Sequence, residues 1–194
     1  MNNNNKPKYK QIIDAAVTVI AENGYHASQV SKIAKQASVA DGTIYLYFKN
    51  KEDILVSLFQ EKMGQFIVKI EKEISELSNA EDKLRRLITM HFNQLVDDHD
   101  LAVVTQLELR QSNKDLRYKI NEVLKGYLQI IDQIVEIGME QGIFREELNK
   151  KLVRQMIFGT IDETVTNWVM KDQKYDLLAQ VDGIHRLIVH GLAK

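Results

Sequence analysis

The side chains best suited to bind another molecule are the hydroxyl-bearing and cationic ones between residues 29 and 51, QVSKIAKQASVADGTIYLYFKNK. Threonine and tyrosine hydroxyls can hydrogen-bond base edges or phosphates, and a tyrosine ring can contact a thymine methyl group. The residues expected to contact DNA are Gln29, Gly42, Thr43, Tyr45, Tyr47, Lys49 and Lys51. Gly42 would allow a close backbone approach because it has no side chain. The alternative for Tyr45 and Tyr47 is a core or hinge position.

The same segment predicts two short helices joined by a tight turn, which is the element needed to position these side chains. Ile33 is an apolar position of the first helix, and residues 37–39 form the turn. A second helix is expected over residues 41–48, with Ile44 and Phe48 on its buried face at i and i+4. Such a pair can place its second helix in the major groove of DNA.

Helical periodicity continues through the rest of the chain and predicts an all-α fold. The sequence has one proline, and few stretches alternate as a strand would. The expected helices cover about residues 8–22, 50–77, 80–97, 100–111, 115–140, 148–171 and 176–191. Asn23-Gly24 ends the first of them, and Asn50 is a good N-cap for the long one. We expect an N-terminal helix-turn-helix three-helix domain over residues 1–50 and a C-terminal helical ligand-binding and dimerisation domain over residues 51–194.

Charge is distributed unevenly along the chain, although its net value is only −1. Residues 1–51 hold seven of the 26 basic residues but three of the 27 acidic ones. A basic N-terminal part on an acidic remainder directs only the N-terminal part towards phosphates. Lys6, Lys8 and Lys10 either follow the minor groove or backbone of DNA or are simply solvated.

Several classes of chemistry have no support in the sequence. The absence of cysteine excludes disulfides, thiolate metal sites and cysteine nucleophiles. The histidines do not predict a metal site, because His185 and His190 are five apart and His91 and His99 flank an expected helix break. None of the patterns GxSxG, HExxH, GxGxxG or the P-loop occurs. We therefore expect no catalytic residues, no metal and no enzyme. Without a long apolar run or a signal-peptide pattern, we expect a cytoplasmic protein that does not contact the membrane.

The residues after about 80 could enclose a hydrophobic ligand. Large apolar side chains are frequent there, and small or polar residues such as Gly159, Thr160 and Thr164 interrupt apolar runs and would leave space if they faced inwards. Ordinary core packing is the simpler alternative. Arg110, Lys114 and Arg117 follow one another closely and could meet phosphates, or could be solvated surface.

The N-terminal quarter of the chain resembles the TetR family of transcriptional repressors. The matching strings are IIDAAVTVIAENGY, SKIAKQASVADGTIYLYF and KNKEDIL. The resemblance implies a repressor that binds double-stranded operator DNA as a homodimer, with Lys51 on a phosphate. Two positions depart from the family pattern. Ser38 stands where glycine is usual and would need a positive φ, and Ala40 stands where serine usually caps the second helix.

A narrower resemblance runs through LAVVTQLELRQSN and RQMIFGTIDETVTNWVMKDQKYD. These strings are similar to those of repressors of fatty-acid degradation genes that long-chain acyl-CoA releases from DNA. The resemblance implies long-chain acyl-CoA as effector rather than a cofactor. The ligand-binding residues expected from it are Phe66, Phe92, Leu107, Arg110, Lys114, Arg117, Tyr127, Ile131, Phe158 and Trp168. One alternative is a TetR-type sensor of another hydrophobic ligand, such as a drug that controls an efflux pump. An alternative of another class is an acyl-CoA-handling enzyme such as a thioesterase.

The last two helices are expected to form the dimer. Their apolar faces would otherwise be exposed, and symmetric operators require two DNA-binding heads. The expected interface residues are Val181, Ile184, Leu187 and Ile188, packed against Ile157, Ile161 or Val165 of the partner.

Overall fold

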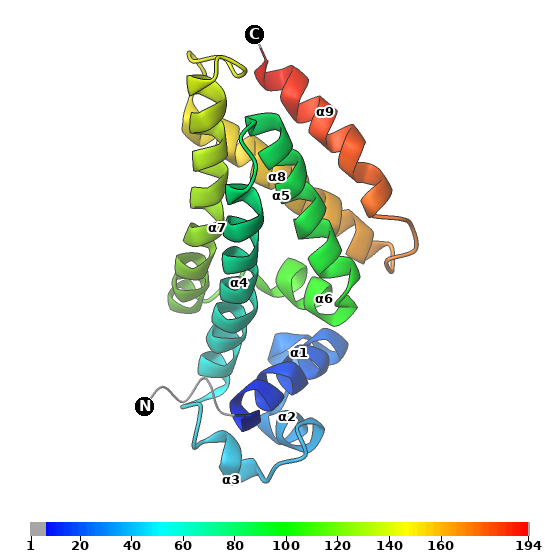
Figure 1. The fold of residues 1–194 in the computed structure, drawn as a ribbon. Helices are drawn as coiled ribbons and strands as arrows, with labels where there is room; N and C mark the ends of the chain where they lie inside the picture. Colours follow the sequence, from blue (N-terminus) through cyan, green and yellow to red (C-terminus); the bar gives the residue numbers. More distant parts are fainter. Residues whose placement is uncertain (1–6, 194) are drawn as a thin grey trace. The chain divides into compact units, whose positions relative to one another are not determined.

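The computed structural model describes residues 7–193, and in this part of the chain every regular element is a helix (Figure 1). The helices are α1 (Pro7–Ala27), α2 (Val30–Gln36), α3 (Asp41–Ile44), α4 (Lys51–Ser75), α5 (Ala80–Val96), α6 (His99–Glu108), α7 (Lys114–Glu140), α8 (Lys150–Met170), the 3-10 turn η2 (Leu178–Gln180) and α9 (Val181–Leu192). One isolated antiparallel bridge joins Phe144 and Ala193. The all-α fold predicted from the sequence is confirmed. None of the helices described is both long and apolar enough to cross a bilayer.

The chain divides into two compact units, and neither is a single stretch of sequence. The head unit contains the described residues up to Gly64 together with Asp100–Val123, and the body unit contains Gln65–His99 and the described residues from Leu124 onwards. The long helices α4 and α7 therefore each contribute one part to the head unit and another to the body unit.

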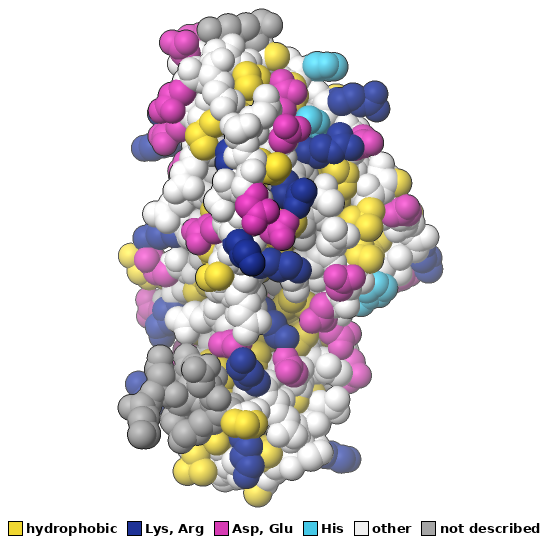
Figure 2. Space-filling model, viewed as in Figure 1, with side chains coloured by type: hydrophobic (Ala, Val, Ile, Leu, Met, Phe, Trp, Pro, Cys, Tyr) yellow, Lys and Arg dark blue, Asp and Glu magenta, His cyan; other side chains and the backbone are white. Residues whose placement is uncertain are grey.

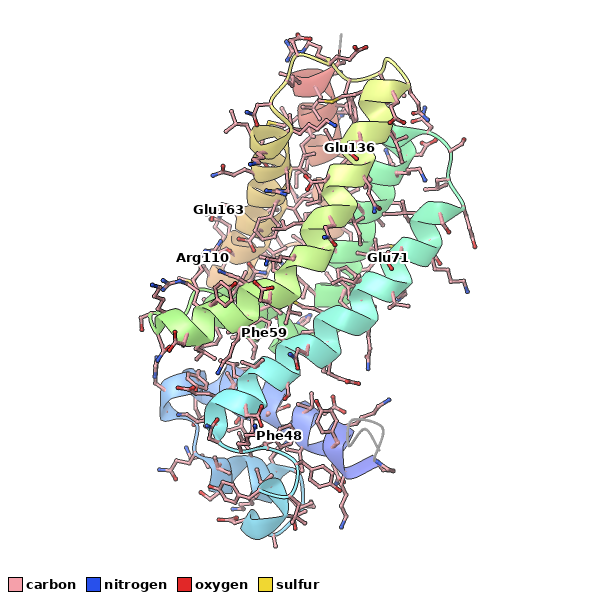
Figure 3. All side chains as sticks on the ribbon, turned by 90° about the vertical axis from the view of Figure 1, so that its left-hand side faces the viewer. Phe48, Phe59, Glu71, Arg110, Glu136 and Glu163 are labelled. Carbon is pink, nitrogen blue, oxygen red and sulfur yellow. The ribbon has the colours of Figure 1, made fainter. Side chains whose placement is uncertain are left out.

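In the head unit, α1 provides the buried face predicted from its periodicity. The side chains of Ile12, Ala15, Ala16, Val19 and Ile20 are all buried. Gly24 breaks the helix, as predicted, because its φ of 73° and ψ of 155° are not helical, although hydrogen bonding resumes as far as Ala27. Phe48 and Phe59, both labelled in Figure 3, are 2% and 0% exposed. The Tyr9 ring stacks on Phe48 with 5.1 Å between the ring centroids, which fixes α1 beside the residues that follow α3.

Asn50 caps α4, as its residue type predicts. Its Oδ1 accepts the Asp53 backbone N–H at 2.8 Å, and the Asp53 carboxylate accepts the Lys49 N–H at 2.9 Å. The two residues thus satisfy backbone donors on both sides of the helix start, which fixes where α4 begins.

In the body unit, α9 packs against α5 and α8. The buried side chains include Leu84, Leu87 and Ile88 of α5, Ile157, Ile161 and Val165 of α8, and Val181, Ile184 and Ile188 of α9. Six of these nine were expected at a dimer interface, and that expectation was wrong, since each is already covered by its own chain. The periodicity that identified them marks a buried face without indicating which molecule covers it. Leu187, by contrast, is 74% exposed.

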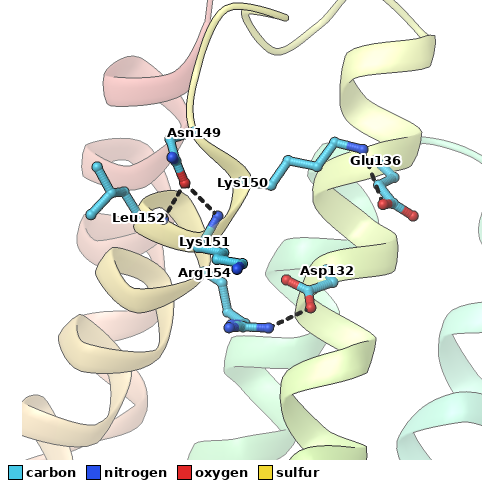
Figure 4. Close-up of polar contacts among 7 residues, drawn as sticks. All are labelled: Asp132, Glu136, Asn149, Lys150, Lys151, Leu152 and Arg154. Carbon is cyan, nitrogen blue, oxygen red and sulfur yellow. Dashed lines mark hydrogen bonds and ion pairs between the residues drawn. The ribbon is translucent and has the colours of Figure 1, made fainter.

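Polar contacts hold the start of α8 to α7 (Figure 4). The Asn149 side chain caps α8 by accepting the backbone N–H groups of Lys151 and Leu152 at 3.0 and 3.3 Å. Arg154 donates to the Asp132 carboxylate of α7 at 2.7 Å, and Lys150 donates to Glu136 at 3.0 Å. Because both ion pairs are partly exposed, they set the alignment of the two helices more than they add stability.

Candidate functional site

The helix-turn-helix of the head unit is formed by α2, the turn at Ser38 and α3. Ser38 has a φ of 51°, which confirms the positive value expected where the family pattern has glycine. The turn is closed by backbone hydrogen bonds from Ser38 to the Lys35 carbonyl and from Val39 to the Ala34 carbonyl, both at 3.0 Å. These bonds allow a non-glycine residue to occupy the left-handed region at this position.

The second helix of the motif is shorter than the sequence predicted. It covers Asp41–Ile44 rather than residues 41–48, although the backbone bond from Phe48 to the Ile44 carbonyl at 3.0 Å adds one more helical turn. No side chain caps its start, in agreement with Ala40 at the N-cap position. Ile44 and Phe48 are both buried, as their spacing predicted.

The residues predicted to contact DNA lie at three places on the head unit. Tyr45 is 58% exposed, and its neighbour Leu46, which the sequence analysis did not select, is 72% exposed. Thr43 and Tyr47 are partly buried, and the Tyr47 ring lies 6.5 Å from that of Tyr9, so Tyr47 also packs against α1. The remaining candidates Gln29, Gly42 and Lys49 are exposed, at the start of α2, within α3 and just before α4.

Lys51 has two backbone partners that its sequence position did not reveal. Its Nζ donates to the carbonyls of Tyr25 and His26, each at 3.0 Å, and lies 4.6 Å from the centroid of the Tyr25 ring. A lysine with two of its three donors on carbonyls ties the end of α1 to the start of α4 and keeps one donor for another acceptor.

Glu108 and Gln111 complete this arrangement and were not predicted. Glu108 Oε1 accepts the backbone N–H of Tyr25 at 2.8 Å, and Glu108 Oε2 accepts the Gln111 side-chain amide at 2.6 Å. The end of α6 is thereby bonded to the residue that follows the break at Gly24. No short-range sequence signal could have identified the bond between Glu108 and Tyr25, because these two residues are 83 positions apart.

The body unit brings four of the predicted ligand-binding residues together with a histidine. Phe66, His91, Phe92, Tyr127 and Phe158, called here the aromatic cluster, come from α4, α5, α7 and α8. The Tyr127 ring lies 6.2 Å from both Phe66 and Phe158, measured between centroids. Tyr127 is buried, whereas Phe66, His91 and Phe158 each retain some accessible surface.

His91 is the polar centre of the aromatic cluster. Its Nδ1 lies 2.9 Å from the Tyr127 hydroxyl, while its Nε2 is buried and has no hydrogen-bond partner. Burial lowers the pKa of His91 to about 4, so the ring is neutral at neutral pH. Burial also raises the pKa of Tyr127, and the nearby Asp162 raises it further. The sequence spacing of His91 does not suit a metal site, and spacing gives no information about a buried hydrogen-bonding role.

The other predicted ligand-binding residues do not all join this cluster. Ile131 and Trp168 are buried in the body unit, and Trp168 donates its indole N–H to the Tyr175 carbonyl at 2.8 Å. Leu107 is 50% exposed and belongs to the head unit, so it was wrongly expected in an apolar interior. Helix α6 is only weakly amphipathic, so its sequence does not indicate whether Leu107 faces the interior or the solvent.

The predicted phosphate-binding cations lie between the end of α6 and the start of α7. Arg110, Lys114 and Arg117 are all exposed side chains of the head unit. Arg117 donates to the carbonyls of Gln111 and Ser112 at 2.9 and 3.3 Å, so it holds the α6–α7 connection. On the face shown in Figure 2, basic and acidic side chains are interspersed and do not gather in one patch. Within residues 7–193, no three histidine or acidic side chains are grouped as a metal site would require.

Comparisons with known proteins agree along almost the whole chain. Residues 12–58 match the family model described as bacterial regulatory proteins, tetR family, and residues 59–191 match the one described as YsiA-like protein, C-terminal region. The chain is 66% identical over 187 residues to the fatty acid metabolism regulator protein of Bacillus subtilis (strain 168), which covers 96% of each chain.

Solved structures give the same relationship. The transcriptional regulator FadR from Bacillus subtilis in complex with stearoyl-CoA has a TM-score of 0.92 at 66% identity, covering 95% of this chain and 99% of that one. The fatty acid degradation regulator FadR from Bacillus halodurans has a TM-score of 0.92 at 65% identity with the same coverage. The helix-turn-helix geometry, both family matches and the identity to a regulator all lead to one conclusion: the chain belongs to the TetR family of bacterial regulatory proteins.

Proposed function

We propose that the protein is a DNA-binding repressor of fatty-acid degradation genes and that long-chain acyl-CoA releases it from its operator. The observation that carries the proposal is the 66% identity, over 96% of both chains, to a fatty acid metabolism regulator. A relative of the same identity has been solved in complex with stearoyl-CoA, and that relative shares this fold at a TM-score of 0.92.

The head unit supplies the DNA-binding surface. Tyr45 and Thr43 are proposed to contact base edges, because they lie on or next to the short helix α3, which a helix-turn-helix would place in the major groove. Lys49, Gln29 and the free donor of Lys51 are proposed to bind phosphates, which position the motif without selecting a sequence. Leu46 joins this set as an exposed apolar side chain able to contact a thymine methyl group.

The body unit supplies the effector site. The aromatic cluster, with Ile131 and Trp168, is proposed to enclose the acyl chain, since aromatic and aliphatic walls favour apolar ligands. Burial contributes about 0.8 kcal/mol per CH₂, so affinity should rise steeply with chain length. Arg110, Lys114 and Arg117 of the head unit remain proposed partners for phosphate groups, because guanidinium and ammonium groups pair well with them.

A second copy of the chain is proposed to cover the exposed face of α8 and α9. Leu152, Met156 and Met170 of α8 and Leu187 of α9 are exposed apolar side chains. Gly159, Gly183 and Gly191 have open space where a side chain would lie, which allows another backbone to approach closely. A two-fold dimer through this face would present two heads to a symmetric operator.

The proposal is tested by adding acyl-CoA of increasing chain length to a pre-formed complex of the protein with its operator. Palmitoyl-CoA should release the DNA in a gel shift, and acetyl-CoA and free coenzyme A should not. Equal effects of all three would remove acyl-CoA as the effector and leave another hydrophobic ligand in its place. Recovery of the thioester intact separates a sensor from a thioesterase.

A further inference from the structure

The Nε2 atom of His91 has no hydrogen-bond partner within the described part of the chain. Buried nitrogens of side chains are almost always hydrogen-bonded, and one without a partner calls for a reason. Nε2 of His91 is buried without a partner, and the rings that contact the His91 imidazole are those of Phe66, Phe92 and Tyr127. The surroundings therefore favour an occupant that is mainly apolar and carries one polar atom.

The hydrogen bond between His91 and Tyr127 determines whether His91 Nε2 is a donor or an acceptor, and so what kind of polar atom the occupant must offer. A neutral imidazole carries one proton, and the 2.9 Å contact joins Nδ1 to the Tyr127 hydroxyl. A phenol is the more acidic donor of the two, and an imidazole nitrogen is the better acceptor. Tyr127 therefore donates to Nδ1, which leaves the ring proton on Nε2 as a donor without an acceptor.

From this geometry we infer that His91 Nε2–H donates a hydrogen bond to the thioester carbonyl oxygen of the bound acyl-CoA and so selects acyl thioesters over other long-chain compounds. The inference rests on the proposed function and goes beyond it by naming the atom that is recognised. A thioester carbonyl is a neutral hydrogen-bond acceptor at the head of an apolar chain. His91 Nε2–H is a single donor that lies among aromatic rings, so the two match.

A free fatty acid fits this position less well than a thioester. A carboxylate, as in a free fatty acid, would need to enter as a charge beside a neutral ring, which is far more costly than burying a neutral carbonyl. His91 should therefore favour the thioester over the free acid as well.

The test compares two ligands that differ at the carbonyl alone, palmitoyl-CoA and the thioether hexadecyl-CoA, in which a CH₂ replaces the C=O. Titration calorimetry on the full-length protein should give about tenfold tighter binding for palmitoyl-CoA, because the thioether leaves the buried donor unpaired. In His91→Leu the two ligands should bind equally. His91→Gln, whose amide can donate from a similar place, should keep part of the preference.

His185→Leu is the matched control, because His185 bonds to the Glu81 carbonyl elsewhere in the body unit. This variant should keep the full preference for palmitoyl-CoA. Equal binding of the two ligands by the unaltered protein, or an unchanged preference in His91→Leu, would overturn the inference while leaving the effector class intact. Binding of neither ligand to the unaltered protein would overturn the proposed function and the inference with it. The comparison in the unaltered protein decides the matter even if His91→Leu does not fold.

Discussion

The carboxylate of Glu108 accepts the backbone N–H of Tyr25 at 2.8 Å, which bonds the end of α6 directly to the residue after the break in α1. Tyr25 is a buried residue and its bond to Glu108 is partly buried, so water can replace this acceptor only incompletely. This bond and the two carbonyl contacts of Lys51 meet on the same short stretch of backbone, Tyr25 and His26.

Removing the Glu108 carboxylate should therefore cost stability. Glu108→Ala leaves the Tyr25 N–H unpaired and should lower the free energy of unfolding by about 1–3 kcal/mol. Glu108→Gln keeps an acceptor oxygen and should lose much less. Urea unfolding followed by circular dichroism measures both, and an equal loss in the two variants would show that charge, rather than the bond to Tyr25, matters.

Gly138 should tolerate no side chain. A Cβ built there would lie 2.0 Å from the Phe144 ring, which is completely buried, so the ring or α7 must shift. Gly138→Ala should destabilise the protein by about 1–3 kcal/mol, as overpacking does. Gly64→Ala is the matched control, because Gly64 lies in α4 with no atom within 4 Å of the added Cβ. It should stabilise by about 0.5–1 kcal/mol, and thermal melts of the two variants should move in opposite directions.

DNA binding should divide into sequence-selective and unselective contributions. Thr43→Ala and Tyr45→Ala should each reduce the preference for the operator over scrambled DNA by about 1–3 kcal/mol. Lys49→Ala should weaken binding to both DNAs alike and reduce its salt dependence. Tyr118→Ala, at another exposed tyrosine of the head unit, should change neither. Gel shifts at two salt concentrations test this, and an unaltered operator preference in a Thr43→Ala, Tyr45→Ala double variant would refute the assignment.

The proposed dimer face depends on Leu187. Leu187→Asp places a charge where the second copy should pack, so light scattering at micromolar concentration should report a monomer. Val68→Asp provides the control, because Val68 is similarly exposed, at 66% against 74% for Leu187, but lies on α4 rather than on α8 or α9. A dimeric mass for Leu187→Asp would place the interface elsewhere.

The free energy of unfolding should fall in acid, because His91 binds a proton less readily in the folded protein than in the unfolded chain. Its pKa is about 4 in the folded protein against 6.5 for an ordinary histidine, so the unfolded chain binds the proton more readily. The resulting stability is present above pH 6.5 and is lost as the pH falls towards 4, by about 3 kcal/mol in all. His91→Gln should remove that part of the pH dependence in urea unfolding measured between pH 7 and 4. If the variant and the unaltered protein lose stability in parallel, other groups are responsible.

Local features were predictable from the sequence, and long-range pairings were not. The buried face of α1 and the cap at Asn50 each depend on neighbours within a few residues, so residue type and spacing were enough. The positive φ of Ser38 was expected from the resemblance to a family that usually has glycine there. The backbone partners of Lys51 and Glu108 at Tyr25 and His26 lie 25 to 83 residues away, and nothing in the local sequence pattern indicates them.

Periodicity also gave no information about what covers a buried face. Ile157, Ile161 and Val165 were identified as apolar face residues and assigned to the partner, but their own chain covers them. The four predicted members of the aromatic cluster were found as large apolar side chains. His91 was missed as a member because its role depends on Tyr127, which follows it 36 residues later.

The discontinuous head unit has a consequence for synthesis of the protein. Residues up to Gly64 leave the ribosome well before Asp100–Val123, which belong to the same compact unit. During that interval the Tyr25 N–H lacks its acceptor, because Glu108 has not yet been translated. The end of α1, which precedes the helix-turn-helix, therefore lacks this bond until α6 has been translated. A premature stop before that point would release a DNA-binding motif without the bond that fixes the end of α1.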